Sequence, residues 1–345
     1  MDVARRAGVS PMTVSRVING EANVRPQTRE LVNVAIGELR YQPNTAARTL
    51  AGAGRIRIGL LYSNPSAGFL SEFLVGSLDQ AARSDVQIVV EKCEIGDHEV
   101  QVARHLVEQG IDGVVLPPPL CEAASVLAVL AAAGVPAVRV AAGAGEGAGE
   151  AGVLATGIDD HAAAAMMTRH IMALGHRRIG FIGGDPTFGA SRHRLAGHRA
   201  ALAEAGIAPD PALIVPGLYT YRSGLDAAEA LLGLAEPPTA IFASNDDMAA
   251  ASVAVAHRRG VSVPGDLTVC GFDDTSLSTA IWPELTTIRQ PIADMARTAI
   301  EMLVRAARQP PDQRGEDGRR VLDFTLVRRQ SDAPPRPPGP QPPQS

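Results

Sequence analysis

Residues 2–19, D-V-A-R-R-A-G-V-S-P-M-T-V-S-R-V-I-N, decide the architecture of the amino-terminal part of the chain. Two short helical patterns flank Gly8, a residue that tolerates the left-handed backbone in which helices often end. Ser10 stands where the second helix needs an N-cap, and Pro11 takes the first helical position, where its missing N–H costs nothing. The stretch therefore predicts two short helices joined by a tight turn.

The second of these helices separates apolar from polar side chains. Val14, Val17 and Ile18 fall on one side and must face a core. The residues of the other side are Met12, Thr13, Ser15, Arg16 and Asn19. Because this side is short and polar and carries an arginine, it can face the edges of DNA bases. Two small helices with this division of faces indicate a DNA-binding helix-turn-helix.

A third helix is predicted over residues 26–40, beginning at Pro26. Its packing stripe is expected to consist of Leu31, Val34, Ala35 and Leu39. Arg25, Thr28 and Arg29 lie near its start, where they can bind DNA phosphates or form a solvated basic face.

The charge of the chain is unevenly distributed. The formal net charge of the 345 residues is −5, which alone argues against a nucleic-acid partner. Residues 1–57, however, contain nine arginines and four acidic residues, which gives +5 and leaves about −10 for the remainder. A basic head on an acidic body is typical of a phosphate-binding module joined to a sensor.

Composition and missing motifs exclude other classes of protein. Three scattered cysteines without zinc-site spacing predict reduced thiols and no bound metal. No run reaches 18 apolar residues and no apolar signal segment opens the chain, so we expect a cytoplasmic protein without a membrane partner. No P-loop, G-x-S-x-G or HExxH motif occurs, and no G-x-G-x-x-G follows the first strand, so neither an enzyme nor a cofactor is expected.

From residue 55 onward, short apolar runs alternate with helical patterns. The run R-I-R-I-G-L-L-Y-S at 55–63 is typical of a buried parallel strand, and the alternation restarts after a Gly/Ala-rich loop at 142–152. The predicted fold class is therefore α/β, with two doubly wound, mostly parallel sheets. Ligands of such folds gather at the carboxyl ends of the strands, so two facing lobes would place one cleft between them.

Several motifs resemble the lactose-repressor (LacI/GalR) family, in that family's order. In the head they are A-x-x-A-G-V-S-x-x-T-V-S-R-V-I-N from residue 4, T-R-E-L-V from 28 and Y-Q-P-N-x-x-A-R-T-L from 41. In the body they are L-G-H-R-R-I-G-F-I from 174, R-L-A-G from 194, S-N-D-D-M-A from 244, G-F-D-D-T from 271 and L-T-T-I-R-Q from 285. The resemblance implies a helix-turn-helix head, a hinge helix and a periplasmic-binding-protein-like sensor body.

The resemblance also implies a division of the chain. Residues 1–42 would form the head, 43–54 the hinge helix and 55–330 the effector-binding domain. By analogy the first lobe takes about 56–157 and 289–319, and the second takes about 158–288 and 320–330. The proline-rich residues 331–345 are expected to form a disordered tail. Because the leucine heptad that ends some members is absent, a homodimer is expected.

In the family, the head and hinge together bind a palindromic operator in double-stranded DNA. Carried over to this sequence, the expected DNA-binding residues are Pro11, Met12, Thr13, Ser15, Arg16, Asn19, Arg25, Thr28, Tyr41, Asn44, Ala47 and Leu50. The hinge helix would pair with that of the dimer partner in the minor groove, where Leu50 would wedge between base pairs. The alternative is a flexible linker whose Leu50 packs on the body.

The candidate effector-binding residues are Asn64, Phe69, Arg194, Tyr219, Asn245 and Asp273. Asn64, Tyr219, Asn245 and Asp273 stand at the carboxyl ends of predicted strands, Phe69 follows the first strand, and Arg194 belongs to the R-L-A-G motif in the predicted helix over 190–205. Arg194, Asn245 and Asp273 occupy motif positions that hold the effector in the family, and Tyr219 stands where the family often has a stacking aromatic. Ala141 departs from the pattern, because some sugar-binding members carry an acid there.

We therefore expect a transcriptional repressor of carbohydrate-utilisation genes whose affinity for its operator changes when a small sugar binds between the lobes. A regulator that needs a purine or another metabolite as corepressor, and a stand-alone sugar-binding protein, are the alternatives. The sequence names neither the effector nor the operator.

Overall fold

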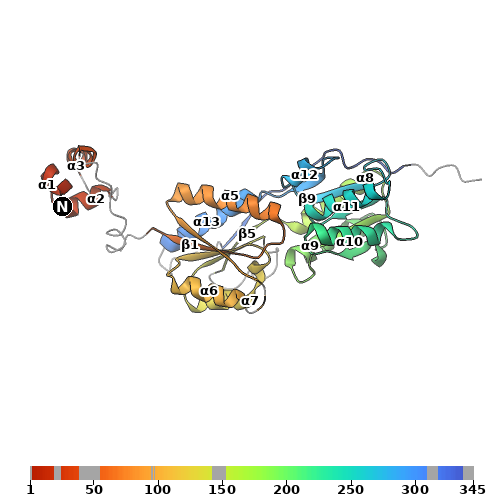
Figure 1. The fold of residues 1–345 in the computed structure, drawn as a ribbon, viewed down its shortest axis with the longest axis horizontal. Coiled ribbons are helices and arrows are strands. Elements are labelled where there is room, and N and C mark those ends of the chain that lie inside the picture. The colour runs from red at the N-terminus through yellow and green to blue at the C-terminus, as the bar shows by residue number, and fades with distance from the viewer. Residues whose placement is uncertain are drawn as a thin grey trace, which may run out of the picture. The chain divides into compact units, whose positions relative to one another are not determined.

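The computed structural model describes residues 2–18, 25–38, 55–94, 96, 98–141, 153–308 and 318–336. The chain divides into two compact units, Met1–Arg55 and Ile56–Ser345, which are described separately. In Figure 1 the described elements of the first unit are all helices, whereas helices and strands alternate in the second unit. The predicted hinge helix, 43–54, lies outside the described residues.

In its described residues the first unit, the head, contains three helices: α1 (Asp2–Ala7), α2 (Pro11–Ile18) and α3 (Pro26–Glu38). Gly8 has a φ of +65° after α1, and the Ser10 hydroxyl accepts a hydrogen bond from the Thr13 backbone N–H at 3.1 Å. The small core consists of Val3, Ala4, Val14, Val17, Val32 and Ala35. The predicted turn and the apolar side of α2 are therefore present.

The predicted stripe of α3 is partly wrong. Leu31 and Val34 are 58% and 54% exposed, whereas Val32 and Ala35 are buried. Residues 32 and 35 lie three apart and share a helix face. Residues 31 and 34 each come one position earlier, so their side chains are turned about 100° away from that face. The apolar spacing alone allowed both stripes, and contact with α1 and α2 selects one of them.

The first lobe of the second unit is a six-stranded parallel sheet in the order β11-β5-β4-β3-β1-β2. Its strands are β1 (Arg57–Tyr62), β2 (Gln87–Lys92), β3 (Gly113–Leu116), β4 (Ala137–Val140), β5 (Val153–Gly157) and β11 (Arg319–Val321). One face is covered by α5 (Ala67–Ser84) and α13 (Ile292–Arg308). The other is covered by α6 (His98–Glu108) and α7 (Ala124–Ala132), with the 3-10 turn η1 (Leu120–Glu122).

The second lobe has a six-stranded sheet in the order β12-β10-β9-β8-β6-β7, antiparallel only at β12. Its strands are β6 (Ile179–Gly183), β7 (Ile214–Pro216), β8 (Ala240–Ala243), β9 (Thr268–Asp273), β10 (Thr286–Arg289) and β12 (Thr325–Val327). Helices α8 (Asp160–Ala173) and α9 (Gly189–Glu204) cover one face, and α10 (Tyr221–Leu232) and α11 (Asp246–Arg258) cover the other. The shorter elements are α12 (Leu277–Ala280) and the 3-10 turn η2 (Pro211–Leu213).

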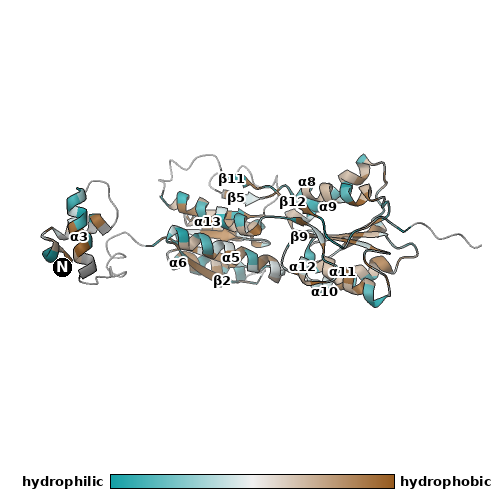
Figure 2. Ribbon diagram, turned by 90° about the horizontal axis from the view of Figure 1, so that it is seen from above, coloured by the Kyte–Doolittle hydropathy of each residue, from teal (hydrophilic) through white to brown (hydrophobic). Residues whose placement is uncertain are grey.

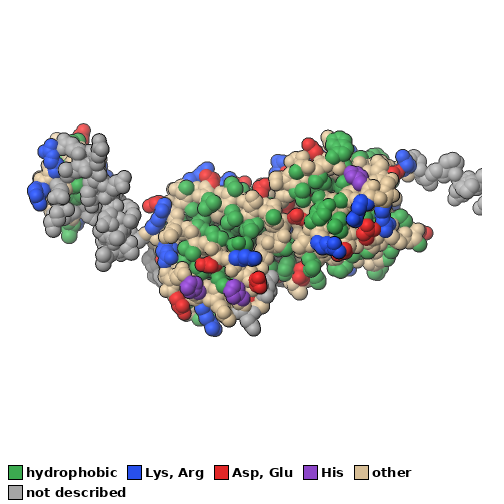
Figure 3. Space-filling model, viewed as in Figure 1, with side chains coloured by type: hydrophobic (Ala, Val, Ile, Leu, Met, Phe, Trp, Pro, Cys, Tyr) green, Lys and Arg blue, Asp and Glu red, His purple; other side chains and the backbone are tan. Residues whose placement is uncertain are grey.

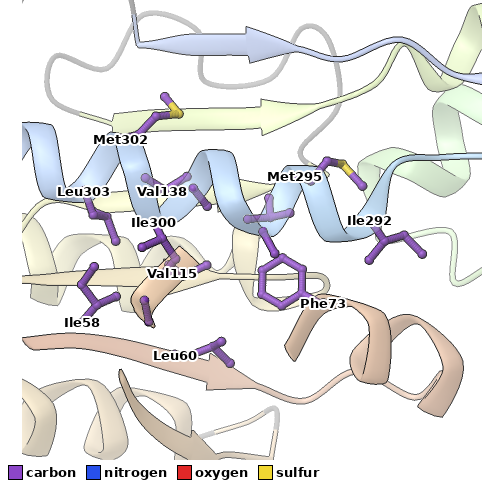
Figure 4. Close-up of a cluster of buried hydrophobic side chains, with 14 of the residues drawn as sticks. Ile58, Leu60, Phe73, Val115, Val138, Ile292, Met295, Ile300, Met302 and Leu303 are labelled. Atoms are coloured by element: carbon purple, nitrogen blue, oxygen red, sulfur yellow. The ribbon is translucent and has the colours of Figure 1, made fainter. Parts of the chain in front are cut away.

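These two sheets confirm the predicted α/β fold. In the hydropathy view the strands are mostly hydrophobic and the outer helix faces hydrophilic (Figure 2). Figure 4 shows how α13 closes the first lobe: Ile292, Met295 and Ile300 face the sheet, where Phe73 of α5 joins them. Within the described residues, no helix is both long and apolar enough to cross a membrane.

The chain crosses between the lobes after β5, after β10 and after β11. Because β11 (Arg319–Val321) pairs with β5, the third crossing falls at residues 322–324, not at 319–320 as predicted. The expectation of a disordered tail from residue 331 is wrong for 331–336. Ser331 and Asp332 are buried, and the Ser331 hydroxyl donates to the Val269 carbonyl at 2.5 Å. Residues 337–345 lie outside the described part.

Candidate effector site and DNA-reading surface

A pocket of about 550 Å³, a volume that includes open solvent at its mouth, lies between the two lobes, at the carboxyl ends of their strands. All six candidate effector-binding residues line it: Asn64, Phe69, Arg194, Tyr219, Asn245 and Asp273. Asn64, which follows β1, and Phe69, in the first turn of α5, come from the first lobe, and the other four come from the second lobe. The parallel sheets bring them together because each follows a strand end or lies on a helix that begins there.

Arg194, on the buried side of α9, is held from three directions. Its Nε donates to Asp160 Oδ1 at 2.8 Å, its Nη1 donates to the Ser244 carbonyl at 2.6 Å, and Nη1 lies 3.7 Å from Asp273 Oδ1. The guanidinium carbon also lies 3.6 Å from the centre of the Phe272 ring. These contacts leave Nη2 as the nitrogen with which Arg194 can meet a ligand in the cavity.

Asp273 ends β9 in a conformation that non-glycine residues rarely adopt, with φ +109°. Its Oδ1 accepts a hydrogen bond from Gln290 Nε2 at 2.5 Å. Burial raises the pKa of Asp273 to about 7, against the opposing attraction of Arg194 and the Gln290 hydrogen bond. Asp273 therefore changes charge near neutral pH. Ala141 and Tyr219, which also line the cavity, have positive φ values of 53° and 58°, and such strain concentrates at functional sites.

Asn245 and Tyr219 form the cavity wall at the start of α11. Asn245 caps this helix: its Oδ1 accepts from the Met248 N–H at 3.0 Å, and its Nδ2 donates to the Tyr219 carbonyl at 3.0 Å. Asn245 therefore caps α11 in addition to lining the cavity. The Tyr219 ring stacks on Phe188, with 6.3 Å between ring centres, and its hydroxyl lies 2.8 Å from Ser191 Oγ. Together these rings give the cavity an aromatic wall.

Two side chains of the first lobe bond to the second lobe beside the cavity. Glu122 of η1 accepts the Gly189 N–H with both carboxylate oxygens, at 2.8 and 3.0 Å, and so caps α9 from the opposite lobe. Ser66, the N-cap of α5, donates its hydroxyl to Asp247 Oδ2 at 2.7 Å. Both contacts exist only while the lobes are close together.

Sequence reasoning missed several residues of the cavity. They include Ser66, Pro118, Cys121, Glu122, Phe188, Ala190 and Gln290. Gln290 ends the L-T-T-I-R-Q motif, and its Oε1 is buried without a hydrogen-bond partner in the described part of the chain. That motif was the available signal for Gln290. No local pattern marks Glu122, because its partner Gly189 is 67 residues away in the sequence.

Helix α2 presents the predicted DNA-reading side. Met12 is 66% exposed, Arg16 is exposed and Thr13 is half-buried, while Val14 and Val17 are buried. Pro11 and Ser15 lie on the same helix. On α3, Arg25 precedes the first turn and is exposed, and Thr28 is half-buried. The remaining predicted DNA-binding positions lie outside the described residues: Asn19, Tyr41, Asn44, Ala47 and Leu50.

No group of histidine, cysteine, aspartate and glutamate side chains in the described residues is arranged to hold a metal ion. The three cysteines are free and buried, as the scattered spacing predicted.

Comparison with known proteins agrees with this geometry. A model of the lacI family of bacterial regulatory proteins matches residues 1–44, and a periplasmic binding protein-like domain matches 168–331. The chain is 35% identical over 324 residues to catabolite control protein A of Priestia megaterium, covering 88% of this chain and 91% of that protein.

Two solved structures share the whole architecture. A complex of the transcriptional regulator CelR with cellobiose has a TM-score of 0.74 and 33% identity, covering 96% of this chain and 98% of that one. The lac repressor dimer bound to operator and the anti-inducer ONPF has a TM-score of 0.76 and 28% identity, with the same coverage. The chain therefore belongs to the lacI family of bacterial regulatory proteins and is a DNA-binding transcriptional regulator.

Proposed function

We propose that this regulator acts in the cytoplasm as a homodimeric repressor of carbohydrate-utilisation genes, and that a small neutral sugar in the interlobe cavity weakens its binding to a palindromic operator. The observation that carries the proposal is the convergence of Arg194, Asp273 and the Tyr219–Phe188 stack in one cavity. The N–H groups of Arg194 Nη2 and the carboxyl group of Asp273 can bond adjacent sugar hydroxyls, while aromatic rings receive the C–H face.

The charges around the cavity favour a neutral sugar over a sugar phosphate. Glu122 and Asp273 line the cavity, and the single lining arginine, Arg194, is already bonded to Asp160. An anionic ligand would meet two carboxylates and no uncommitted cation among the described lining residues. A neutral polyol avoids this repulsion and can use both carboxylates as acceptors.

The contacts between the lobes supply a route from the cavity to the DNA. A ligand shifts the arrangement of the lobes only by as much as its affinities for the two arrangements differ. A sugar that bonds Asp273 and Arg194 on one lobe and Asn64 on the other changes the balance now set by Glu122–Gly189 and Ser66–Asp247. Because the hinge segment adjoins the first lobe in sequence, a changed lobe arrangement alters the spacing of the two heads.

Exposed apolar side chains support the homodimer. Hydrophobic side chains gather on the face of the first lobe seen in Figure 3. Val75 and Leu78 of α5 are 62% and 58% exposed, and in the second lobe Leu218 and Trp282 are 56% and 73% exposed. Large exposed apolar groups of this kind mark surfaces that bind another protein. We assign them to contact with a second copy of the chain.

On the DNA, α2 would enter the major groove of each operator half-site. Arg16 would donate to a guanine edge, which is the commonest specific contact, and Met12 would meet a thymine methyl group. The hinge helices, with Leu50 at their ends, would widen the minor groove at the centre of the palindrome.

A thermal-shift screen of neutral mono- and disaccharides, sugar phosphates and purines tests the effector. We expect a neutral sugar to raise the melting temperature of the wild-type chain. The Arg194→Lys variant keeps a cation beside Asp160 but loses the planar fork, so it should fold and lose at least about tenfold in affinity for that sugar. Stabilisation by a purine alone would favour the corepressor alternative and overturn the sugar assignment.

A further inference from the structure

A second pocket lies in the second lobe, away from the interlobe cavity. Its volume is about 560 Å³, open solvent at the mouth included, and it lies between the carboxyl-terminal half of α9, the start of β6 and the segment that leads from α9 to β7. We call it the side pocket. It shares no lining residue with the interlobe cavity, and it opens at the amino end of β6, the opposite end of the sheet.

Most of the walls of the side pocket are apolar, although the Arg178–Asp210 ion pair also lines it. Leu202 comes from α9, Ile207 from the segment that follows it, Leu213 from η2 and Ile214 from β7. Leu202 and Leu213 are buried, while Ile207 and Ile214 are partly exposed along the opening.

A buried histidine supplies one polar end. His198 of α9 is 1% exposed, and its ring stacks on Phe181 with 4.8 Å between ring centres. The Thr168 hydroxyl donates to the Ala164 carbonyl at 2.9 Å, so it accepts from His198 Nδ1, 3.0 Å away. Nδ1 therefore carries the proton and Nε2 is left as an acceptor. Burial lowers the pKa of His198 to about 4, so the ring stays neutral at neutral pH.

The other polar end is an arginine at the mouth. Arg177 is exposed and forms no hydrogen bond or ion pair within the described residues, although it lines the pocket. Its neighbour Arg178 is committed, because it donates to Asp210 Oδ2 at 2.9 Å and to the Glu236 carbonyl at 2.7 Å. Arg177 thus offers a free cation beside an apolar pocket whose inner histidine accepts a hydrogen bond.

We propose that the side pocket is a second ligand site, for a small carboxylic acid with an apolar body and a hydroxyl or N–H group at its far end. The carboxylate would bind Arg177, the apolar body would lie against Leu202, Ile207 and Leu213, and the far group would donate a hydrogen bond to His198 Nε2. Small apolar pockets with a few convergent polar groups are the usual form of such sites. The site differs in place and in ligand charge from the sugar site proposed above.

Isothermal titration calorimetry on the full chain tests this with 4-hydroxybenzoate, which carries a carboxylate and a hydroxyl at opposite ends of a flat apolar ring. We expect saturable binding at one site per chain. Benzoate lacks the hydroxyl and phenol lacks the carboxylate, so each should bind at least about tenfold more weakly.

Variants locate the site. Arg177→Gln should weaken 4-hydroxybenzoate binding at least about tenfold, whereas Arg199→Gln, an exposed arginine of α9 that does not line the pocket, should leave it unchanged. His198→Phe keeps a ring beside Phe181 and should remove the preference for 4-hydroxybenzoate over benzoate. Absence of saturable binding, or equal binding by Arg177→Gln and Arg199→Gln, would overturn the proposal, and neither surface change threatens folding.

Discussion

At Asp273 three constraints meet: a left-handed backbone, burial and a short hydrogen bond from Gln290. The motif G-F-D-D-T and its position at a strand end pointed to this residue, and the family resemblance grouped it with Arg194, so both were predictable from sequence. Its raised pKa was not. The pKa is raised mainly by burial of Asp273, with smaller contributions from Asp247 and Asp160, and this burial arises only after the sheet and its helices have assembled.

The raised pKa of Asp273 predicts a pH effect on stability. A carboxyl that holds its proton more tightly when folded adds stability as the pH falls through about 7, and this contribution is lost as the pH rises. Between about pH 7.5 and pH 6 the free energy of unfolding of the wild type should therefore gain roughly 1 kcal/mol relative to Asp273→Asn. Urea denaturation at several pH values measures this difference. Parallel pH curves for the two proteins would show that Asp273 does not titrate in the folded protein over this pH range.

Among the elements, α9 shows what local patterns can and cannot indicate. Its helical pattern predicted a helix over 190–205, and the helix covers Gly189–Glu204. Phe188 gives it no side-chain cap, and the cap comes instead from Glu122 of the other lobe. In the head, periodicity likewise predicted α3 but chose Leu31 and Val34 for its core, because only tertiary contact distinguishes two adjacent apolar stripes.

The cap from Glu122 predicts a change in lobe closure. In Glu122→Ala the Gly189 N–H would lose its acceptor, which for a helix cap costs about 1 kcal/mol. The lost hydrogen bond stabilises only the arrangement in which the two lobes lie close together, so the variant should populate more open arrangements. Small-angle scattering of the unliganded variant should therefore show a larger radius of gyration than that of the wild type. The matched control is Glu108→Ala, at an exposed position of α6. Equal radii for both variants would show that other contacts hold the lobes together.

For the whole molecule, the order of motifs along the chain predicted two lobes and three crossings. The sequence did not indicate that residues 331–336 continue the fold, since S-D-A-P-P-R has the composition of a linker. The side chains explain why they do. Asp332 accepts from Thr286 Oγ1 at 2.6 Å and from His170 Nε2 at 2.9 Å, and the Ala333 carbonyl accepts from Thr268 Oγ1 at 2.9 Å.

These contacts predict different effects of two truncations. Ending the chain after Gln330 removes Ser331, Asp332 and Ala333 and should lower the free energy of unfolding by at least about 3 kcal/mol, since several buried groups lose their partners. Ending it after Arg336 keeps all of them and should change it by less than about 0.5 kcal/mol. Chemical denaturation of both chains provides the comparison. A stable chain ending at Gln330 would mean that the segment contributes little.

The central claim is that occupancy of the interlobe cavity controls operator binding, and fluorescence anisotropy with a labelled palindromic operator tests it most directly. The dissociation constant should rise at least about tenfold when the sugar found by thermal shift is saturating, and Arg194→Lys should keep its operator affinity while losing this response. Binding to a scrambled duplex should stay weak and unaffected by the sugar. If a sugar that saturates the wild-type cavity left operator affinity unchanged, the account would be contradicted.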